Sequence, residues 1–170
     1  MVPKIRIVDS SLLILLDQYD GLKQFCDDCS SKKITTITSP KVFEETVSNP
    51  RRLARYKDSA DKIEQTIFES GIVRVEKVIY DPFISMISDR ARDLIAKRSG
   101  VARHRIERAD LEIISLAFTH LKNGGKTEVI FRDRAMRHAL VTLAKRYDRE
   151  KNIEIIDILP YFRRTLKILR

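Results

Sequence analysis

The 170-residue sequence contains little glycine and proline, five residues of each, and no long apolar run. So few of these residues exclude a linker-rich or low-complexity chain. No stretch approaches the roughly 20 apolar residues that a membrane span needs. The apolar run at 12–16 is short and ends at Asp17, which does not fit a signal peptide. We therefore expect a cytoplasmic protein, and a chain of this length most simply folds as one domain over residues 1–170.

Cysteine and histidine are also scarce. The two cysteines, Cys26 and Cys29, stand in the order CDDC, a spacing that can bind zinc or carry out redox chemistry. A zinc ribbon needs a second such pair, which the sequence lacks, and the three histidines are scattered. A thioredoxin-like pair would follow a strand directly, whereas this pair lies late in a helical stretch. We therefore interpret both cysteines as ordinary reduced thiols.

Positive charge is in excess, with 33 Lys and Arg against 24 Asp and Glu and a net charge of +9. A surplus of this size favours a polyanionic partner, most often nucleic acid. The alternative is the densely charged surface of a thermophilic protein. No aromatic-rich stretch of the kind that stacks single-stranded bases stands out. The composition therefore favours a nucleic acid partner and gives no base specificity.

Short β-branched runs alternate with longer stretches of helical apolar spacing. We predict strands at 4–9, 34–38, 72–78, 127–131 and 153–156, the third of them at a sheet edge. Helices are predicted between the strands. Gly21 interrupts the first helix, Ser39 caps the helix that starts at Pro40, and Pro50 ends that helix. A charged helix over 51–69 would turn Leu53 and Tyr56 inward. This alternation predicts an α/β fold, a three-layer α/β/α arrangement around a mostly parallel sheet of about five strands.

Four acidic positions fall where such a sheet would bring them together. They are Asp9 at the end of the first strand, Glu44 or Glu45 after the second, Asp110 at the start of the helix before the fourth, and Asp133 directly after the fourth. Open α/β sheets carry their sites at the carboxyl ends of their strands. Carboxylates gathered there would raise each other's pKa, and a hard cation such as Mg²⁺ or Mn²⁺ would remove that repulsion. For each acid the alternative is a helix cap or a solvated residue at a helix start.

The order of these pieces resembles the PIN-domain ribonucleases, the family of the VapC-like toxins, over nearly the whole chain. The resemblance rests on the segments 7–10, 39–45, 109–117 and 129–136. It implies a PIN-like fold and a metal site in which Asp9, Glu45, Asp110 and Asp133 bind Mg²⁺ or Mn²⁺, with Ser10 in support. Glu45 is preferred to Glu44 because the family's glutamate usually lies three residues after an apolar helix position, as Glu45 follows Val42. Glu107 and Glu112 have a weaker claim.

The same resemblance implies hydrolysis of RNA by a metal-bound water, either in RNA processing or as the toxin of a toxin–antitoxin pair. An antitoxin protein and a second copy of the chain are the partners implied. Basic residues flank the predicted site, and we expect five of them to contact RNA phosphates: Arg103, Arg105, Arg108, Arg132 and Arg134. The alternative is that these arginines form a solvated helical face.

Two other readings of the sequence remain. Phe131 occupies a position, two residues before Asp133, where the family usually has a small hydroxyl residue, so a catalytically weakened RNA-binding or scaffolding module is the second hypothesis. A phosphotransfer protein is the third. Receiver domains need an acidic pair at the first strand and some phosphatases need Asp-x-Asp, but Asp9 stands alone and Ser11 occupies the second position.

Overall fold

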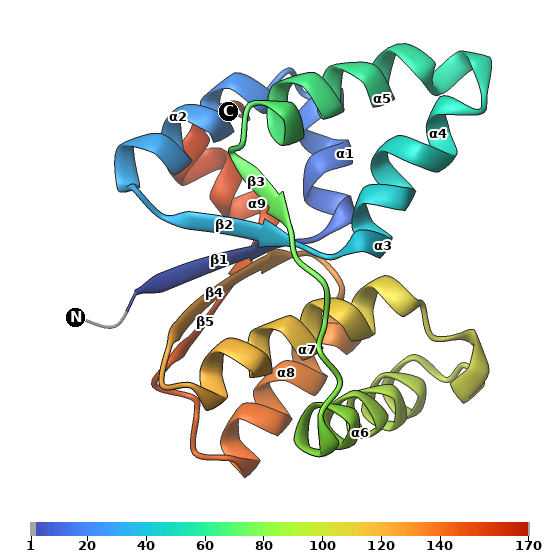
Figure 1. Ribbon diagram of the computed structural model, residues 1–170, viewed down its shortest axis with the longest axis vertical. Helices are drawn as coiled ribbons and strands as arrows, with labels where there is room; N and C mark the ends of the chain where they lie inside the picture. The colour runs from blue at the N-terminus through green and yellow to red at the C-terminus, as the bar shows by residue number, and fades with distance from the viewer. Residues whose placement is uncertain (1–2, 170) are drawn as a thin grey trace.

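A parallel sheet forms the middle layer of the computed structural model, which describes residues 3–169 (Figure 1). Within these residues the sheet has five strands in the order β3-β2-β1-β4-β5, and every neighbouring pair is parallel. The strands are β1 (Lys4–Val8), β2 (Thr35–Thr38), β3 (Val73–Val75), β4 (Lys126–Phe131) and β5 (Ile153–Asp157). The predicted α/β fold is confirmed, and so is the edge position of the third strand.

Helices cover both faces of the sheet. Figure 1 shows α1 (Ser10–Gln18), α2 (Leu22–Lys32), α5 (Lys57–Ile63) and α9 (Ile158–Tyr161) on one face. The other face carries α6 (Pro82–Ser99), α7 (Arg108–Lys122) and α8 (Arg134–Arg146). The shorter elements are α3 (Pro40–Phe43), η1 (Glu44–Ser48), α4 (Asn49–Arg51), η2 (Ala54–Tyr56), η3 (Glu64–Glu69), η4 (Arg103–Arg105) and η5 (Phe162–Leu166). Among the described residues, none of the helices has the length and apolarity to cross a membrane.

The core lies on both sides of β1. Ile7 and Val8 of this strand are fully buried, because a parallel strand between two helical layers has no solvent-facing side. On one side α1 contributes Leu12 and Leu16, and on the other α7 buries Ile114 together with most of its length. The central strand is therefore held rigidly, and whatever follows its carboxyl end is positioned by the core.

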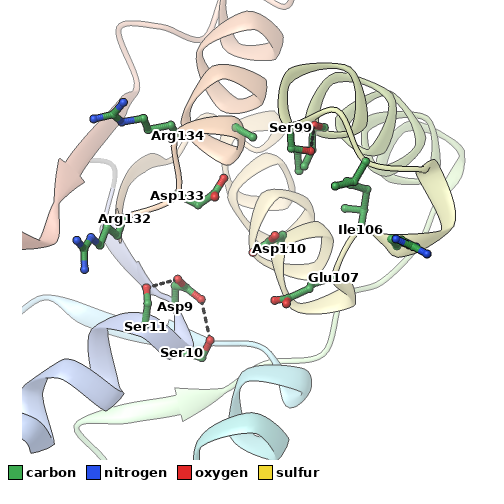
Figure 2. A pocket seen from close by; sticks show the side chains of 14 residues that line it. Asp9, Ser10, Ser11, Ser99, Ile106, Glu107, Asp110, Arg132, Asp133 and Arg134 are labelled. Carbon is green, nitrogen blue, oxygen red and sulfur yellow. Dashed lines mark hydrogen bonds between the residues drawn. The ribbon is translucent and has the colours of Figure 1, made fainter.

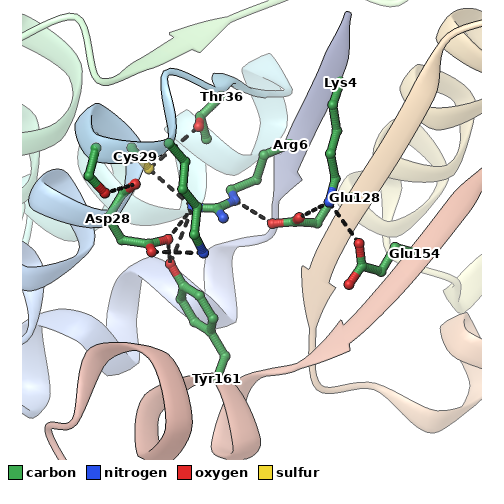
Figure 3. A network of polar contacts seen from close by, with 10 residues as sticks. Lys4, Arg6, Asp28, Cys29, Thr36, Glu128, Glu154 and Tyr161 are labelled. Carbon is green, nitrogen blue, oxygen red and sulfur yellow. Dashed lines mark hydrogen bonds and ion pairs between the residues drawn. The ribbon is translucent and has the colours of Figure 1, made fainter.

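A charged network is also buried against β1 (Figure 3). Arg6 is fully buried, and its guanidinium donates to Glu128 at 2.6 Å, Asp28 at 2.8 Å and the hydroxyl of Tyr161 at 3.2 Å. The Tyr161 hydroxyl in turn donates to Asp28 at 2.7 Å. These contacts join β1 to β4, α2 and α9, so the network ties the centre of the sheet to one helical layer.

Local cap signals act as the sequence predicts. The Ser39 hydroxyl accepts a hydrogen bond from the backbone N–H of Val42 at 3.3 Å, with Pro40 in the first helical turn. The Asp81 carboxylate caps α6 in the same way, accepting from the N–H of Ile84 at 2.8 Å. The predicted break near Gly21 separates α1 from α2.

The predicted end of the helix at Asn49-Pro50 lies one residue before the observed end at Arg51. The helix that begins at Pro40 continues through the π-helical turn η1 into α4, which contains Pro50. In η1 the N–H of Asn49 donates to the carbonyl of Glu44, five residues back. A turn of this width eases the clash between a proline ring and the carbonyl four residues before it. The helix therefore contains Pro50 and ends one residue after it.

The prediction that Leu53 and Tyr56 point inward is also wrong. Leu53 is 51% exposed and Tyr56 is 44% exposed. Leu53 has an extended backbone, with φ −106° and ψ 118°, and the chain turns there through η2 before α5 begins. The apolar periodicity is therefore reset, and the buried stripe starts again at Ala60, Ile63 and Ile67.

Candidate functional site

A cavity of about 660 Å³ opens at the carboxyl ends of β1 and β4, between the two helical layers. Four acids line it: Asp9, Glu107, Asp110 and Asp133 (Figure 2). They come from the end of β1, from the start of α7 and from the end of β4. Segments more than a hundred residues apart in the sequence thus place their carboxylates around one space, which we call the carboxylate cavity.

Asp9 is the most enclosed of these acids, with 7% of its surface exposed. It precedes the first residue of α1, but its side chain accepts no hydrogen bond from the amides of that helix. Its two oxygens instead accept hydrogen bonds from the hydroxyls of Ser10, at 3.1 Å, and Ser11. The alternative that Asp9 caps a helix is therefore not observed, and the two serines fix the orientation of its carboxylate.

Asp133 caps a helix and also lines the cavity. One carboxylate oxygen caps α8, accepting from the N–H of Met136 at 2.6 Å. The side chain also lines the carboxylate cavity, where Figure 2 shows it across from Asp110. Phe131, at the position where a hydroxyl residue was expected, is fully buried in the core and does not line the cavity.

Asp110 lies in the first turn of α7 and is half-buried. Burial is the largest cause that raises the pKa of its carboxyl group, to about 7, and the charges of Asp9, Glu107, Asp133 and Glu45 raise it further. Carboxylates repel in this way only when they share a poorly solvated space. Asp110 therefore lies where the negative potential of the whole cluster converges.

Glu45 and Glu44 differ clearly in their surroundings. Glu44 is exposed and pairs with Lys41, which lowers the pKa of Glu44. Glu45 is half-buried, and its pKa is raised by burial and by the charges of Glu107 and Asp9, against an opposing hydrogen bond with Ser10. Glu45 does not line the carboxylate cavity itself, yet it interacts with the same acids. This difference agrees with the preference for Glu45.

The cluster does not by itself form a finished metal site. Within residues 3–169, no three His, Cys, Asp or Glu side chains lie close enough together to hold one ion. The donor chemistry nevertheless fits a hard divalent cation, because the side chains that converge offer carboxylate and hydroxyl oxygens. The raised pKa of Asp110 reflects its burial first and then the repulsion by neighbouring acids, which such a cation would relieve. The four-residue ligand set remains a prediction.

The two acids with the weaker claim have separate positions. Glu107 lines the carboxylate cavity and raises the pKa of both Asp110 and Glu45. Glu107 directly precedes the first residue of α7 and has an extended backbone, with φ −63° and ψ 136°, so its position beside Asp110 is set by the turn into the helix and had no clear signal in the sequence. Glu112 is buried elsewhere and accepts hydrogen bonds from the backbone N–H of Lys41 at 3.1 Å and from Arg108 at 2.9 Å.

The five arginines expected to bind RNA divide into two groups. Arg105, Arg132 and Arg134 line the carboxylate cavity. Arg103 is instead paired with Asp93 at 2.6 Å and Asp89 at 3.5 Å, and Arg108 is paired with Glu112. The structure therefore places three of the five at the cavity and engages the other two in ion pairs.

Comparison with known proteins agrees with this architecture. The chain is similar to a crystal structure of VapBC2 from Rickettsia felis bound to a DNA fragment from their promoter, with a TM-score of 0.51 and 12% identity. The similarity covers 90% of this chain and 98% of the other, and at this identity it shows a shared fold. No curated protein sequence matches the chain. The halobacterial PIN domain, as a family, matches residues 2–166. This match spans nearly the whole sequence, and the protein therefore belongs to the halobacterial PIN-domain family.

Proposed function

We propose that the protein is a metal-dependent endoribonuclease that hydrolyses RNA phosphodiesters in the carboxylate cavity. The observation that carries the proposal is the convergence of Asp9, Asp110 and Asp133 on one cavity, with burial and neighbouring charges raising the pKa of Asp110 to about 7. Acids arranged in this way destabilise the folded protein unless a cation joins them. Membership of a PIN-domain family supports the nuclease class.

Each residue of the site has a distinct part in this proposal. Asp9, Glu45, Asp110 and Asp133 would hold Mg²⁺ or Mn²⁺, and Ser10 and Ser11 orient Asp9 for that task. When bound, such an ion activates water and neutralises charge on the phosphodiester under attack. The guanidinium groups of Arg105, Arg132 and Arg134 would hold the phosphates of the RNA beside the acids.

The biological role follows from the same family. We propose that the protein acts in the cytoplasm, either in RNA processing or as the toxin of a toxin–antitoxin pair. The similarity to VapBC2, a complex bound to DNA of its promoter, supports an antitoxin partner and a homodimer as candidates for assembly. A toxin would be inhibited by a small partner protein encoded with it, whereas a processing enzyme would act without one.

Cleavage of labelled single-stranded RNA tests the proposal. We expect cutting with Mn²⁺ or Mg²⁺, none with EDTA, and a loss of about 10²-fold or more in Asp9→Asn and Asp110→Asn. The matched control is Asp27→Asn, which makes the same change on the exposed face of α2. Cleavage that persists in Asp9→Asn, or that resists EDTA, would contradict the proposal.

A second candidate is a catalytically weakened RNA-binding module. The observation that favours it is the absence, among residues 3–169, of three potential ligands close enough to hold one ion, together with Phe131 at the altered corner of the cluster. Salt-sensitive RNA binding without cleavage in any divalent metal would establish this candidate in place of the nuclease.

A further inference from the structure

A second cavity, also of about 660 Å³, adjoins the carboxylate cavity. Its lining is dominated by basic side chains, and we call it the arginine groove: Arg98, Arg132, Arg134, Arg137 and His138. Arg132 and Arg134 line both spaces, so the two are continuous. Figure 2 shows these two arginines beside Asp133, on the side away from Glu107.

Most of the guanidinium groups in the arginine groove have no carboxylate partner, and Arg137 is the exception. Asp157 is the acid among its lining residues, and it lies 3.6 Å from Arg137 while also capping α9 through the N–H of Leu159. Across residues 3–169, no carboxylate forms an ion pair with Arg98, Arg132 or Arg134. Exposed guanidinium groups held close together without counter-charges favour a bound polyanion.

The basic surface continues beyond the arginine groove. A smaller cavity of about 280 Å³ is lined by Lys97, Arg98, His138 and Leu94, and it shares Arg98 and His138 with the groove. These residues come from the last turns of α6 and from the first half of α8, two helices that pack against each other. The three cavities thus form one track that starts at the carboxylates and ends at Lys97.

We propose that the arginine groove binds the sugar–phosphate backbone of a single RNA strand on one side of the phosphodiester to be cut. This inference rests on the proposed nuclease function and adds the path of the substrate. A guanidinium matches a phosphate through two parallel hydrogen bonds. The groove's lining includes no phenylalanine, tyrosine or tryptophan on which bases could stack. The strand is therefore held through its phosphates and without preference for sequence.

Binding in EDTA tests the groove independently of cleavage. The probe is a fluorescein-labelled single-stranded RNA of about 12 nucleotides, titrated by fluorescence anisotropy at several salt concentrations. The double variant Arg98→Ala/Arg137→Ala should bind about tenfold more weakly at low salt. The slope of log affinity against log salt concentration should become shallower by about 1.4, the change expected for the loss of two phosphate contacts on a single strand.

The matched control is Arg163→Ala/Arg164→Ala, which removes the same charge from two exposed arginines of η5, in the other helical layer. Its affinity should stay close to that of the unaltered protein. Equal affinity of the two double variants overturns the proposal. Tighter binding of duplex DNA than of single-stranded RNA, lost in the groove variant, overturns the choice of occupant.

Cleavage kinetics separate this inference from the proposed function. On long RNA, the groove variant Arg98→Ala/Arg137→Ala should have a higher KM than the unaltered protein and nearly the same kcat. A dinucleotide is too short to enter the groove, so the variant and the unaltered protein should cut it equally well. Unchanged KM on long RNA overturns the groove and leaves the nuclease intact. If the unaltered protein binds RNA but does not cut it, and the groove variant loses this binding, the result supports the groove and refutes the nuclease.

Discussion

Asp110 shows how one carboxyl group can make the fold depend on pH. Burial and four neighbouring acids raise its pKa to about 7, whereas an unfolded chain would leave it near 4. Between these values the folded protein holds a proton that the unfolded chain has lost. In the absence of metal, the contribution of Asp110 to stability therefore falls as pH rises from about 4 to about 7, and is constant above that range.

Removing this charge should stabilise the metal-free protein at neutral pH. We expect Asp110→Asn in EDTA to raise Tm at pH 7.5 by about 3–6 °C, the effect of roughly 1.5 kcal/mol in a chain of this size. The gain in Tm should disappear near pH 4, where Asp110 of the folded protein is protonated and therefore uncharged like the asparagine of the variant. Thermal unfolding of the two proteins from pH 4 to pH 8 measures this, and a gain that is constant with pH would contradict the assignment.

Arg6 presents the opposite case, a buried cation whose partners depend on it. Replacing it with methionine keeps much of the side-chain volume but removes the buried cation between Glu128 and Asp28, which keep only the partly exposed Lys4 and Lys32 as ion-pair partners. Loss of one member of a buried ion pair costs about 3–5 kcal/mol. Arg6→Met should therefore lower the free energy of unfolding in urea by that amount.

Lys4→Met is the control for Arg6→Met. Lys4 contacts the same Glu128 at 2.7 Å, but its side chain is 42% exposed. A surface ion pair contributes up to about 1 kcal/mol, so this variant should change stability little. Similar losses in the two variants would show that burial does not decide the strength of these contacts.

At the scale of elements, Glu112 connects the two helices that carry Glu45 and Asp110. It lies on α7, is 4% exposed, and accepts a hydrogen bond from the first turn of α3 through the N–H of Lys41. The helix of α3 continues directly into η1, which holds Glu45. Glu112 is therefore a positioning residue, because it fixes the distance between two acids of the cluster.

Two substitutions of Glu112 should have graded effects. Glu112→Gln retains a carbonyl oxygen for Lys41 and loses the charge that pairs with Arg108. Glu112→Ala loses both contacts and leaves the partly buried N–H of Lys41 without this acceptor, at a cost of about 1 kcal/mol or more. Urea unfolding should rank stability as unaltered protein, Gln, then Ala. In RNA cleavage kcat should follow the same order at nearly constant KM, and equal kcat in both variants would contradict a positioning role.

Elements with strong local signals could be predicted from the sequence, and those that depend on packing could not. β1, α7 and the cap at Ser39 carry their signals within a few residues. The passage of the helix through Pro50 depends on the π-helical turn before it, for which apolar spacing gives no sign. The prediction that Leu53 is buried fails for a related reason, because one residue with an extended backbone interrupts the helical periodicity.

At the scale of the whole molecule, the convergence of the acids could be predicted because the carboxyl ends of parallel strands lie at one edge of a sheet. Asp9 and Asp133 follow adjacent strands, and their convergence needs only the pairing of β1 with β4. The arginine groove could not be predicted in this way. Arg98 and Arg137 lie on different helices, and only the packing of α6 on α8 brings them into one cavity.

A cation bound by the acids of the carboxylate cavity should raise the stability of the whole protein. A ligand that binds only the folded state stabilises it by about 2.7 kcal/mol at 100 times its Kd, or roughly 6–10 °C in Tm here. Mn²⁺ or Mg²⁺ should produce such a rise at pH 7.5, and Asp9→Asn should abolish it. Thermal unfolding with EDTA, Mn²⁺ and Mg²⁺ measures this, and an equal rise in Asp9→Asn would place the cation elsewhere.

The pairing of β1 with β4 also has a consequence during protein synthesis. Val8 is matched with Ile130, so β1 waits for a neighbouring strand that is made more than a hundred residues later. A nascent chain that has emerged from the ribosome only as far as α7 holds Asp9, Glu45 and Asp110 but lacks Asp133 and the strand that places it. If the protein cuts RNA as proposed, its cutting site is completed only after β4 and Asp133 have been made, more than a hundred residues after Asp9.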